Sequence, residues 1–272
     1  MKNVSRRQFL GASLAAIPLS GLLLRAAEAQ SDAFPLGCQS YSFRNFDFAG
    51  AIEQLQALGL NEMEFFSGHL PPDVNHEGFE AAKAAIEAAG VNVRCFGVES
   101  YTADDAHNRQ RFEFAKALGI EVLSAHPTAD SYDNLEVLVD EFDIKIGIHN
   151  HGPGHAYDGV QDTLDAVEGR DIRIGACLDT GHCIRSNEQP HEVIRTLGDR
   201  LHALHLKDWV HGAEETIVGE GDMDLIACVE ALRDVNFDGP IMLEYELSPN
   251  NPVPDMAQGI INWRQAVDTV MG

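Results

Sequence analysis

Short apolar runs rich in β-branched residues alternate with longer amphipathic stretches along most of the chain. The short runs have the length and composition of buried strands, whereas the longer stretches repeat apolar residues at helical spacing. The pattern predicts strands at residues 36–42, 62–66, 92–98, 121–126, 145–150, 173–179, 203–207 and 241–244. It predicts helices at residues 49–58, 77–89, 105–118, 135–142, 160–167, 191–197, 224–235 and 256–271.

This regular alternation of strand and helix predicts a parallel sheet. Eight such units in about 240 residues have the size of a (β/α)8 barrel. Gly59, Gly90 and Gly119 follow three of the helices, where a left-handed residue commonly ends a helix. The alternative is a doubly wound open sheet, but the first strand is not followed by its Gly-x-Gly-x-x-Gly turn. We therefore expect an α/β fold with a single TIM barrel over residues 30–272.

The first 29 residues have the features of a targeting segment. Arg6 and Arg7 precede an apolar stretch at residues 11–24, and Ala27 and Ala29 form a small-residue cleavage pattern. The stretch is too short to span a bilayer comfortably, so an uncleaved anchor is the weaker alternative. The pattern resembles a twin-arginine export signal. We expect residues 1–29 to be removed, leaving a periplasmic or otherwise exported protein without stable membrane association.

Composition and charge narrow the classes of function. Hydrophobic residues make up 44% and charged residues 23% of the 272, as in folded globular proteins. The 43 acidic residues against 19 basic ones give a net charge of -24, which argues against a nucleic-acid surface because phosphate binding needs a basic footprint. The five cysteines show no metal-type or redox-type pair spacing, so we expect buried free thiols.

Candidate metal ligands gather where the predicted strands end. His149, Asp179, His205 and Glu244 end strands five, six, seven and eight. Alternate side chains of a strand share one face, and in each strand the aliphatic residues occupy the face opposite to these four. Because the carboxyl ends of barrel strands meet at one mouth, we expect the four side chains to converge there.

Two imidazoles and two carboxylates suit one divalent ion such as Mn²⁺, Co²⁺, Fe²⁺ or Zn²⁺, with Mg²⁺ also compatible and Ca²⁺ disfavoured. A single buried His or Asp is more often a structural group, but four at one depth favour a metal site. Lys207 shares the inward face with His205, although an ion pair with Asp208 at the surface is the alternative. We expect the remaining histidines outside the strand ends to be solvated or packed on helices: His76, His107, His191, His202 and His211.

The Gly-Glu-Gly-Asp segment at residues 219–222 admits two interpretations. Its glycines are typical of a phosphate-binding loop, but its acidic residues disfavour phosphate. A tight loop in which Asp222 caps the next helix is therefore the favoured interpretation.

Four segments together resemble the xylose isomerase-like TIM barrels, the superfamily of sugar isomerases, epimerases and AP endonucleases. The segments are residues 176–182 (Ala-Cys-Leu-Asp-Thr-Gly-His), 205–208 (His-Leu-Lys-Asp), 219–222 and 241–246 (Ile-Met-Leu-Glu-Tyr-Glu). The resemblance covers essentially the whole chain after residue 29. It is specific for the superfamily and says little about the substrate.

The resemblance implies roles for individual residues. Asp179, His205 and Glu244 match family metal ligands, and His182 matches a position that contacts the substrate or a second metal. Glu64 and His126 match positions that line the pocket. One position departs from the pattern: the epimerases have Glu before Asn-His-Gly, whereas this chain has His149 there.

That departure affects the expected reaction. In the epimerases the carboxylates of strands five and eight remove and return a proton on opposite faces of the substrate. With His149 the metal site persists, but this pair of carboxylates does not. Either His151 or Glu246 supplies the second base, or the reaction is not a plain epimerisation.

The leading expectation is a divalent-metal-dependent isomerase or epimerase of a keto-sugar or related polyol, acting through an enediolate. Glu244 is the expected base and His151 or His182 its partner acid, with Glu64, His126, Lys207 and Glu246 binding substrate. A lyase, dehydratase or hydratase acting on a keto-sugar or 3-keto-glycoside is the alternative. A non-catalytic sugar-binding barrel is a weaker one, and the acidic charge disfavours an abasic-site endonuclease. A homo-oligomer is compatible with the sequence.

Overall fold

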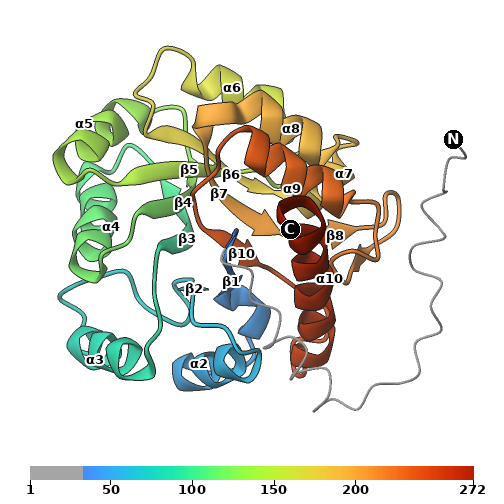
Figure 1. Ribbon diagram of the computed structural model, residues 1–272. Helices are drawn as coiled ribbons and strands as arrows, with labels where there is room; N and C mark the ends of the chain where they lie inside the picture. The colour runs from blue at the N-terminus through green and yellow to red at the C-terminus, as the bar shows by residue number, and fades with distance from the viewer. Residues whose placement is uncertain (1–32) are drawn as a thin grey trace, which may run out of the picture.

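A computed structural model of the chain describes residues 33–272, so the expected signal at residues 1–29 lies outside the described residues. Eight parallel strands form one sheet in the order β2-β1-β10-β7-β6-β5-β4-β3. Single parallel bridges from Glu62 to Asn92 and from Phe65 to Phe96 join the two edge strands. The sheet is thus a nearly closed barrel, which confirms the predicted fold (Figure 1). The strands are β1 (Leu36–Gln39), β2 (Met63–Glu64), β3 (Cys95–Tyr101), β4 (Val122–Pro127), β5 (Lys145–His149), β6 (Ile174–Asp179), β7 (Leu201–Leu206) and β10 (Ile241–Leu243).

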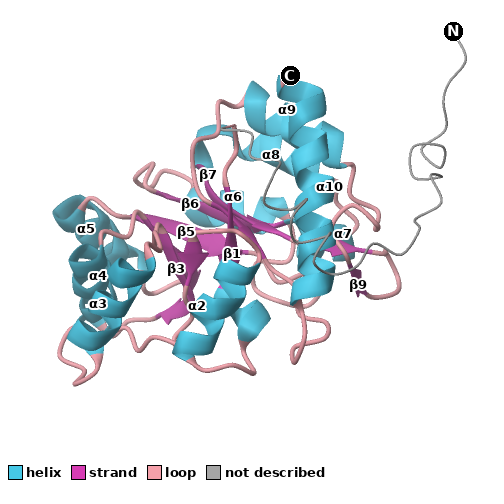
Figure 2. Ribbon diagram, turned by 60° about the horizontal axis from the view of Figure 1, so that its bottom comes forward, coloured by secondary structure: helices cyan, strands magenta, loops and turns pink. Residues whose placement is uncertain are grey.

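Helices surround the strands on the outside of the barrel (Figures 1 and 2). Gly90 and Gly119 end two of them in the left-handed conformation, with φ of 66° and 75°, as the sequence predicts. The helices are α2 (Phe48–Ala57), α3 (Phe79–Ala89), α4 (Asp105–Leu118), α5 (Tyr132–Phe142), α6 (Val160–Val167), α7 (Thr180–Arg185), α8 (Pro190–Leu197), α9 (Leu225–Asp234) and α10 (Val253–Met271).

The barrel interior and the layer between sheet and helices have different cores. Aliphatic residues of β6 and β7, such as Leu178 and Leu204, belong to the large core that includes the helices. Inside the barrel a separate cluster of small and medium side chains fills the centre below the mouth: Cys95, Val122, Cys177, Ala203 and Met242. Cys177 and Ala203 therefore point inward, as the strand alternation predicts, and so do the residues two positions later in each strand.

Three local elements differ from the expected pattern. Strand β1 ends at Gln39, because the Gln39 side chain accepts a hydrogen bond from Tyr41 N and caps a short 3₁₀ helix, η2 (Ser40–Phe43). The short helix α7 directly follows β6. A hairpin of β8 (Asp208–Trp209) and β9 (Glu215–Thr216) follows β7 at the mouth of the barrel.

The expected helix cap at residue 222 is wrong. Asp224 is the N-cap of α9, and its side chain accepts a hydrogen bond from Ala227 N at 3.1 Å. Asp222 instead accepts a hydrogen bond from His211 N. The cap is displaced by two residues because α9 begins at Leu225, one residue later than predicted.

All five cysteines lie in the described part of the chain, and each is buried with a free thiol. Within residues 33–272, no helix combines the length and the apolar character needed to cross a bilayer.

Candidate metal centre and active site

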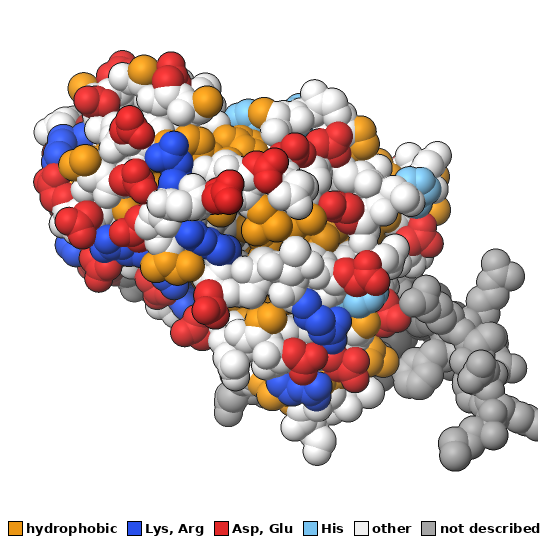
Figure 3. Space-filling model, turned by 90° about the horizontal axis from the view of Figure 1, so that it is seen from above, with side chains coloured by type: hydrophobic (Ala, Val, Ile, Leu, Met, Phe, Trp, Pro, Cys, Tyr) orange, Lys and Arg blue, Asp and Glu red, His pale blue; other side chains and the backbone are white. Residues whose placement is uncertain are grey.

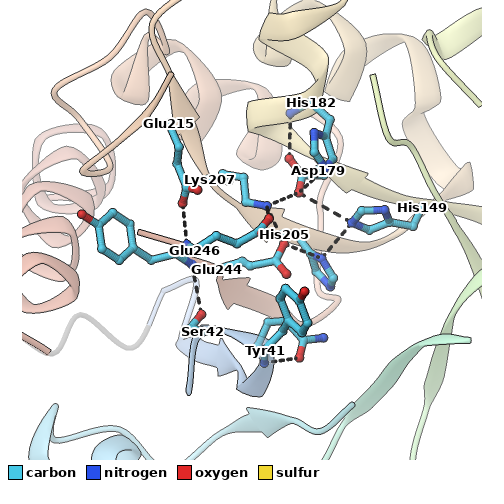
Figure 4. Close-up of polar contacts among 12 residues, drawn as sticks. Tyr41, Ser42, His149, Asp179, His182, His205, Lys207, Glu215, Glu244 and Glu246 are labelled. Atoms are coloured by element: carbon cyan, nitrogen blue, oxygen red, sulfur yellow. Dashed lines mark hydrogen bonds and ion pairs between the residues drawn. The ribbon is translucent and has the colours of Figure 1, made fainter. Parts of the chain in front are cut away.

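Four side chains from neighbouring strands meet at the mouth of the barrel (Figure 4). His149 ends β5, Asp179 ends β6, His205 lies near the end of β7, and Glu244 directly follows β10. One ligand atom from each lies within 4.8 Å of all the others, and all four residues are buried. The convergence expected from strand alternation is present. We call these four residues the quartet.

The ligand atoms of the quartet face one another. His149 Nε2 lies 3.0 Å from His205 Nδ1 and 3.6 Å from Asp179 Oδ2. His205 Nδ1 lies 3.5 Å from Glu244 Oε2. Asp179 Oδ2 is buried and has no hydrogen-bond partner. A buried carboxylate oxygen left without a donor is costly unless something else compensates its charge, as a cation would.

Glu64 orients His205 from below. Its Oε2 lies 2.9 Å from His205 Nε2, and both side chains are fully buried. When the ring is neutral, a proton on Nε2 donated to this carboxylate directs the Nδ1 lone pair into the quartet. Burial would lower the pKa of His205, but Cys177 and Glu64 outweigh burial and hold the pKa well above its usual value, so a cation entering the quartet would displace a proton from Nδ1. Glu64 was expected to line the pocket for substrate. The structure places it behind His205 instead.

Asp179 is held on three sides by hydrogen bonds. Its backbone N–H donates to Asn150 Oδ1 at 2.8 Å, and its carbonyl accepts from Asn150 Nδ2 at 3.0 Å. Its Oδ1 accepts from His182 N at 2.8 Å and thereby caps α7. These contacts fix the carboxylate so that Oδ2 faces the quartet.

Lys207 is buried beside the quartet, as its inward position in the strand predicts. Its Nζ lies 3.4 Å from Asp179 Oδ2, 3.0 Å from Glu244 Oε2 and 2.7 Å from Glu246 Oε1. Burial would lower the pKa of Lys207, but these carboxylates outweigh burial and raise it well above its usual value. The same contact with Lys207 is the main reason why the pKa of Glu244 is lowered despite burial. Both carboxylates of the quartet are therefore charged.

The donor set fits a divalent cation. Two imidazole nitrogens and two carboxylate oxygens are the ligand types of Mn²⁺, Fe²⁺, Co²⁺ and Zn²⁺ sites. Asp179 Oδ2 accepts no hydrogen bond, with Lys207 Nζ as an ion-pair partner 3.4 Å away, and loss of the Nδ1 proton would give His205 a lone pair at the centre. The buried cluster thus suggests a divalent metal without deciding its identity.

His182 lies at the edge of the quartet in a defined tautomer. Its Nδ1 accepts a hydrogen bond from Arg185 Nη1 at 2.8 Å. Arg185 has no lone pair to offer, so the ring proton must sit on Nε2, which lies 3.9 Å from Asp179 Oδ2. The Arg185 guanidinium also stacks over Trp209 at 4.9 Å. Burial lowers the pKa of His182 to about 4, so it is a neutral donor at pH 7.

His151 is the second imidazole beside the quartet. Its ring centroid lies 4.6 Å from that of His149 and 5.7 Å from that of His182. Its Nδ1 is buried and has no hydrogen-bond partner. Burial, followed by the neighbouring imidazoles, lowers the pKa of His151 to about 3. The ring is therefore neutral and offers an unused nitrogen.

The other expected site residues lie farther out. The half-buried His126 ring is 5.2 Å from the His151 ring and 5.4 Å from the Tyr157 ring. Glu246 is half-buried, is bound to Lys207, and donates its backbone N–H to Glu215 Oε1 at 2.8 Å. Burial raises the pKa of this Glu215 carboxyl to about 7. Neither Arg185 nor Glu215 was singled out from the sequence.

A comparison with protein families covers most of the barrel. The sequence profile of the xylose isomerase-like TIM barrel matches residues 52–266. The chain belongs to this family. Members of the xylose isomerase-like family share the barrel described above, and the match extends from α2 into α10.

Individual relatives within the xylose isomerase-like family are distant. A 3-oxo-isoapionate decarboxylase of Pectobacterium atrosepticum is 32% identical over 80 residues, which cover 29% of this chain and 28% of the relative. An inosose dehydratase of Clostridium perfringens is 23% identical over 220 residues, which cover 71% of this chain and 73% of the relative. The alignment with an inosose dehydratase of Clostridium botulinum spans 51% of that relative, so the chain covers about half or less of the length of the first relatives it matches.

A solved structure with a similar fold contains a metal. The IOLI protein with a bound zinc atom aligns with a TM-score of 0.69 and 16% identity, covering 87% of this chain and 98% of that one. At this identity the likeness shows the fold.

Proposed function

We propose that this protein is a divalent-metal-dependent lyase that removes water, or another β-leaving group, from a keto-sugar or related cyclic polyol. The observation that carries the proposal is the replacement of one carboxylate by an imidazole. In the pattern of the epimerases two carboxylates flank the substrate, whereas here His149 stands at one of these positions and Glu244 at the other.

The quartet has a plain chemical use in this proposal. A bound divalent ion would polarise the ketone and make the proton on the adjacent carbon more acidic. Glu244 is the base that accepts this proton. His182 presents its Nε2–H toward the same volume and donates a hydrogen bond to a substrate oxygen. His149, Asp179 and His205 hold the ion and keep its position fixed relative to Glu244.

A single carboxyl group suffices for elimination but not for epimerisation. The proton taken by Glu244 can pass to the departing hydroxyl group, so that a carbon–carbon double bond forms and water leaves. Epimerisation instead needs a second group that returns a proton to the opposite face. The similarity to an inosose dehydratase over 71% of the chain supports the same choice.

Isomerisation or epimerisation is the second candidate, and one observation favours it. The buried Nδ1 of His151 has no partner and could exchange a proton on the face opposite to Glu244. A non-catalytic sugar-binding barrel would not need this ordered set of proton-transfer groups.

Proton NMR in deuterium oxide separates the two reactions. We expect metal-loaded protein to convert inosose, or a neutral ketohexose, to the unsaturated product that has lost one water. Deuterium incorporation with inversion of configuration at that carbon, and without any unsaturated product, would show an epimerase instead. Chelator-treated protein is the control and should do neither. The variant His149→Glu restores the second carboxylate, and we expect it to gain deuterium exchange with inversion.

We also propose that the chain is exported after removal of residues 1–29, on the basis of the paired arginines and the apolar stretch that follows. Cells that express the full chain should accumulate a mature form beginning near Gln30 outside the cytoplasm. Replacing Arg6 and Arg7 together by lysine should retain the precursor in the cytoplasm. N-terminal sequencing of the fractions tests both points.

A further inference from the structure

The loop after β7 has the backbone of an anion cradle, but the protein fills it with its own carboxylate. Asp208 Oδ2 accepts from Gly219 N at 2.9 Å and from Gly221 N at 3.0 Å. Its Oδ1 accepts from Trp209 N at 2.8 Å and from Met223 N at 3.1 Å. Converging backbone N–H groups are a common phosphate-binding device. Loops in this region of TIM barrels frequently bind phosphate. Here the device is occupied.

The cationic side chains around the mouth also already have partners within the protein. Lys207 faces the carboxylates of Asp179, Glu244 and Glu246. Arg185 donates to His182 and stacks over Trp209. Neither is left to neutralise an incoming anion.

Arg44, at the end of η2, is also committed. Its Nη2 donates to the carbonyl of Glu246 at 2.6 Å, and its Nη1 donates to the carbonyl of Tyr41 at 3.2 Å. Its guanidinium lies over the Tyr41 ring at 4.9 Å. Because η2 directly follows the end of β1, this arginine lies on the β1 side of the mouth.

We propose that the site takes an uncharged polyhydroxy ketone and rejects the phosphate esters of the same sugars. This inference rests on the proposed function. The imidazole rings of His151 and His182 lie beside the quartet, and their ring nitrogens suit hydroxyl and carbonyl groups. Away from the metal, a phosphate dianion would enter beside the three carboxylates around Lys207, and no described cationic side chain at the mouth is free to compensate it, at a high desolvation cost.

The charge of the whole molecule acts in the same direction. The net charge of -24 repels anions at long range. Figure 3 shows Asp and Glu side chains spread over the face it draws, with Lys and Arg side chains between them. Anionic sugars therefore gain neither steering nor a contact site.

The first test uses matched ligands and the protein loaded with Co²⁺. Binding of D-fructose and of D-fructose 6-phosphate, and of inorganic phosphate alone, is measured by calorimetry. We expect the phosphate ester and phosphate to bind at least about tenfold more weakly than the neutral sugar. Equal or tighter binding of the ester would overturn the inference.

The second test opens the cradle. Asp208→Ala frees the four N–H groups, and we expect the variant to bind inorganic phosphate at least about tenfold more tightly than the wild type. Asp222→Ala, in the same loop, is the matched control and should not gain phosphate binding. A folded Asp208→Ala variant without any gain would overturn the account of the cradle. If that variant does not fold, the ligand pair above still decides the inference on the wild-type protein.

The outcomes distinguish this inference from the proposed function. Failure of every keto-sugar to react or bind would sink the proposed function. Phosphate binding that is absent in the wild type and present in Asp208→Ala would still support the exclusion of anions from this barrel mouth.

Discussion

Strand β7 carries two buried histidines, which differ in their hydrogen-bond partners and in the direction in which their pKa is shifted. His202 lies near the start of the strand, at the bottom of the barrel, and its Nε2 donates to the carbonyl of Ile172 at 2.9 Å. His205 lies three residues further along the strand, at the mouth, where its two nitrogens face Glu64 and the quartet. Burial lowers the pKa of His202 to about 4, whereas neighbouring groups raise the pKa of His205.

The difference shows that burial alone does not make a functional site. At the bottom of the barrel, polar side chains pair with backbone carbonyls. Arg200 Nη1, for example, donates to the carbonyls of Asp171 and Ile174. At the mouth, side chains from four strands pair with one another, and some polar atoms, such as Asp179 Oδ2, remain without a hydrogen bond. Only the second arrangement leaves bonding capacity for a ligand.

The sharpest way to break this comparison is to remove one histidine at a time. We expect His205→Ala to lower both activity and divalent-metal affinity by at least about 1,000-fold, because a ligand to the reacting centre is lost. Glu244→Gln should reduce activity similarly. His202→Gln is the matched control and should retain metal binding and turnover. Calorimetric metal titration and initial rates measure both; a fully active His205→Ala protein would remove the quartet from the mechanism.

The two histidines should also differ in their effect on acid stability. The folded-state pKa of His202 is about 4, below the usual 6.5, because burial and the cations Lys145 and Arg200 disfavour its charged form more than the carbonyl of Ile172 favours it. Between pH 6.5 and 4 the unfolded chain binds a proton that the folded chain does not. The stabilisation is therefore present above pH 6.5 and is lost as the pH falls toward 4, by up to about 3 kcal/mol.

Urea unfolding of metal-free protein at several pH values tests this linkage. His202→Gln should flatten the dependence of the free energy of unfolding on pH between 6.5 and 4. An unchanged slope would mean that His202 titrates normally in the folded state.

The barrel itself follows from the pattern of apolar positions, because a strand–helix alternation leaves few other architectures. Helices α4 and α6 have the bounds that the sequence predicts. The missed elements are short: α7 has six residues and depends on Asp179 as its cap. The β8–β9 hairpin has two residues in each strand and no apolar alternation to reveal it.

The quartet could also be placed from the sequence, since strand alternation fixes which side chains point inward. The contacts that tune it could not. Glu64 and His205 are 141 residues apart, and nothing in either segment indicates that their side chains share a proton. The carboxylate of Asp208, which accepts from the backbone of the glycine loop at residues 219–222, is a similar case, because the loop sequence predicts a tight turn but does not indicate which side chain fills it. Such contacts depend on side-chain directions at the ends of different strands.

A smaller effect should follow from loosening His205 without removing it. In Glu64→Gln the side-chain oxygen can still accept from His205 Nε2, but the negative charge that favours this proton is gone. We expect divalent-metal affinity to fall by about 10- to 100-fold. Calorimetric titration measures the change, and Glu62→Gln, at the residue directly before the same strand, is the control. Unchanged affinity in Glu64→Gln would limit its role to packing.

The smallest effect is expected for a histidine that belongs to neither end of β7. His191 lies in the first turn of α8 and is half-buried, and its Nδ1 has no hydrogen-bond partner. Its contact with Arg195 runs through the backbone carbonyl, which a substitution keeps. His191→Ala should therefore change the free energy of unfolding by no more than about 0.5 kcal/mol. It should leave metal affinity and turnover unaltered. A large loss of activity in this variant would mean that an imidazole outside the barrel mouth contributes to function. The functional difference between histidines at the mouth, such as His205, and those elsewhere, such as His202, would then not hold.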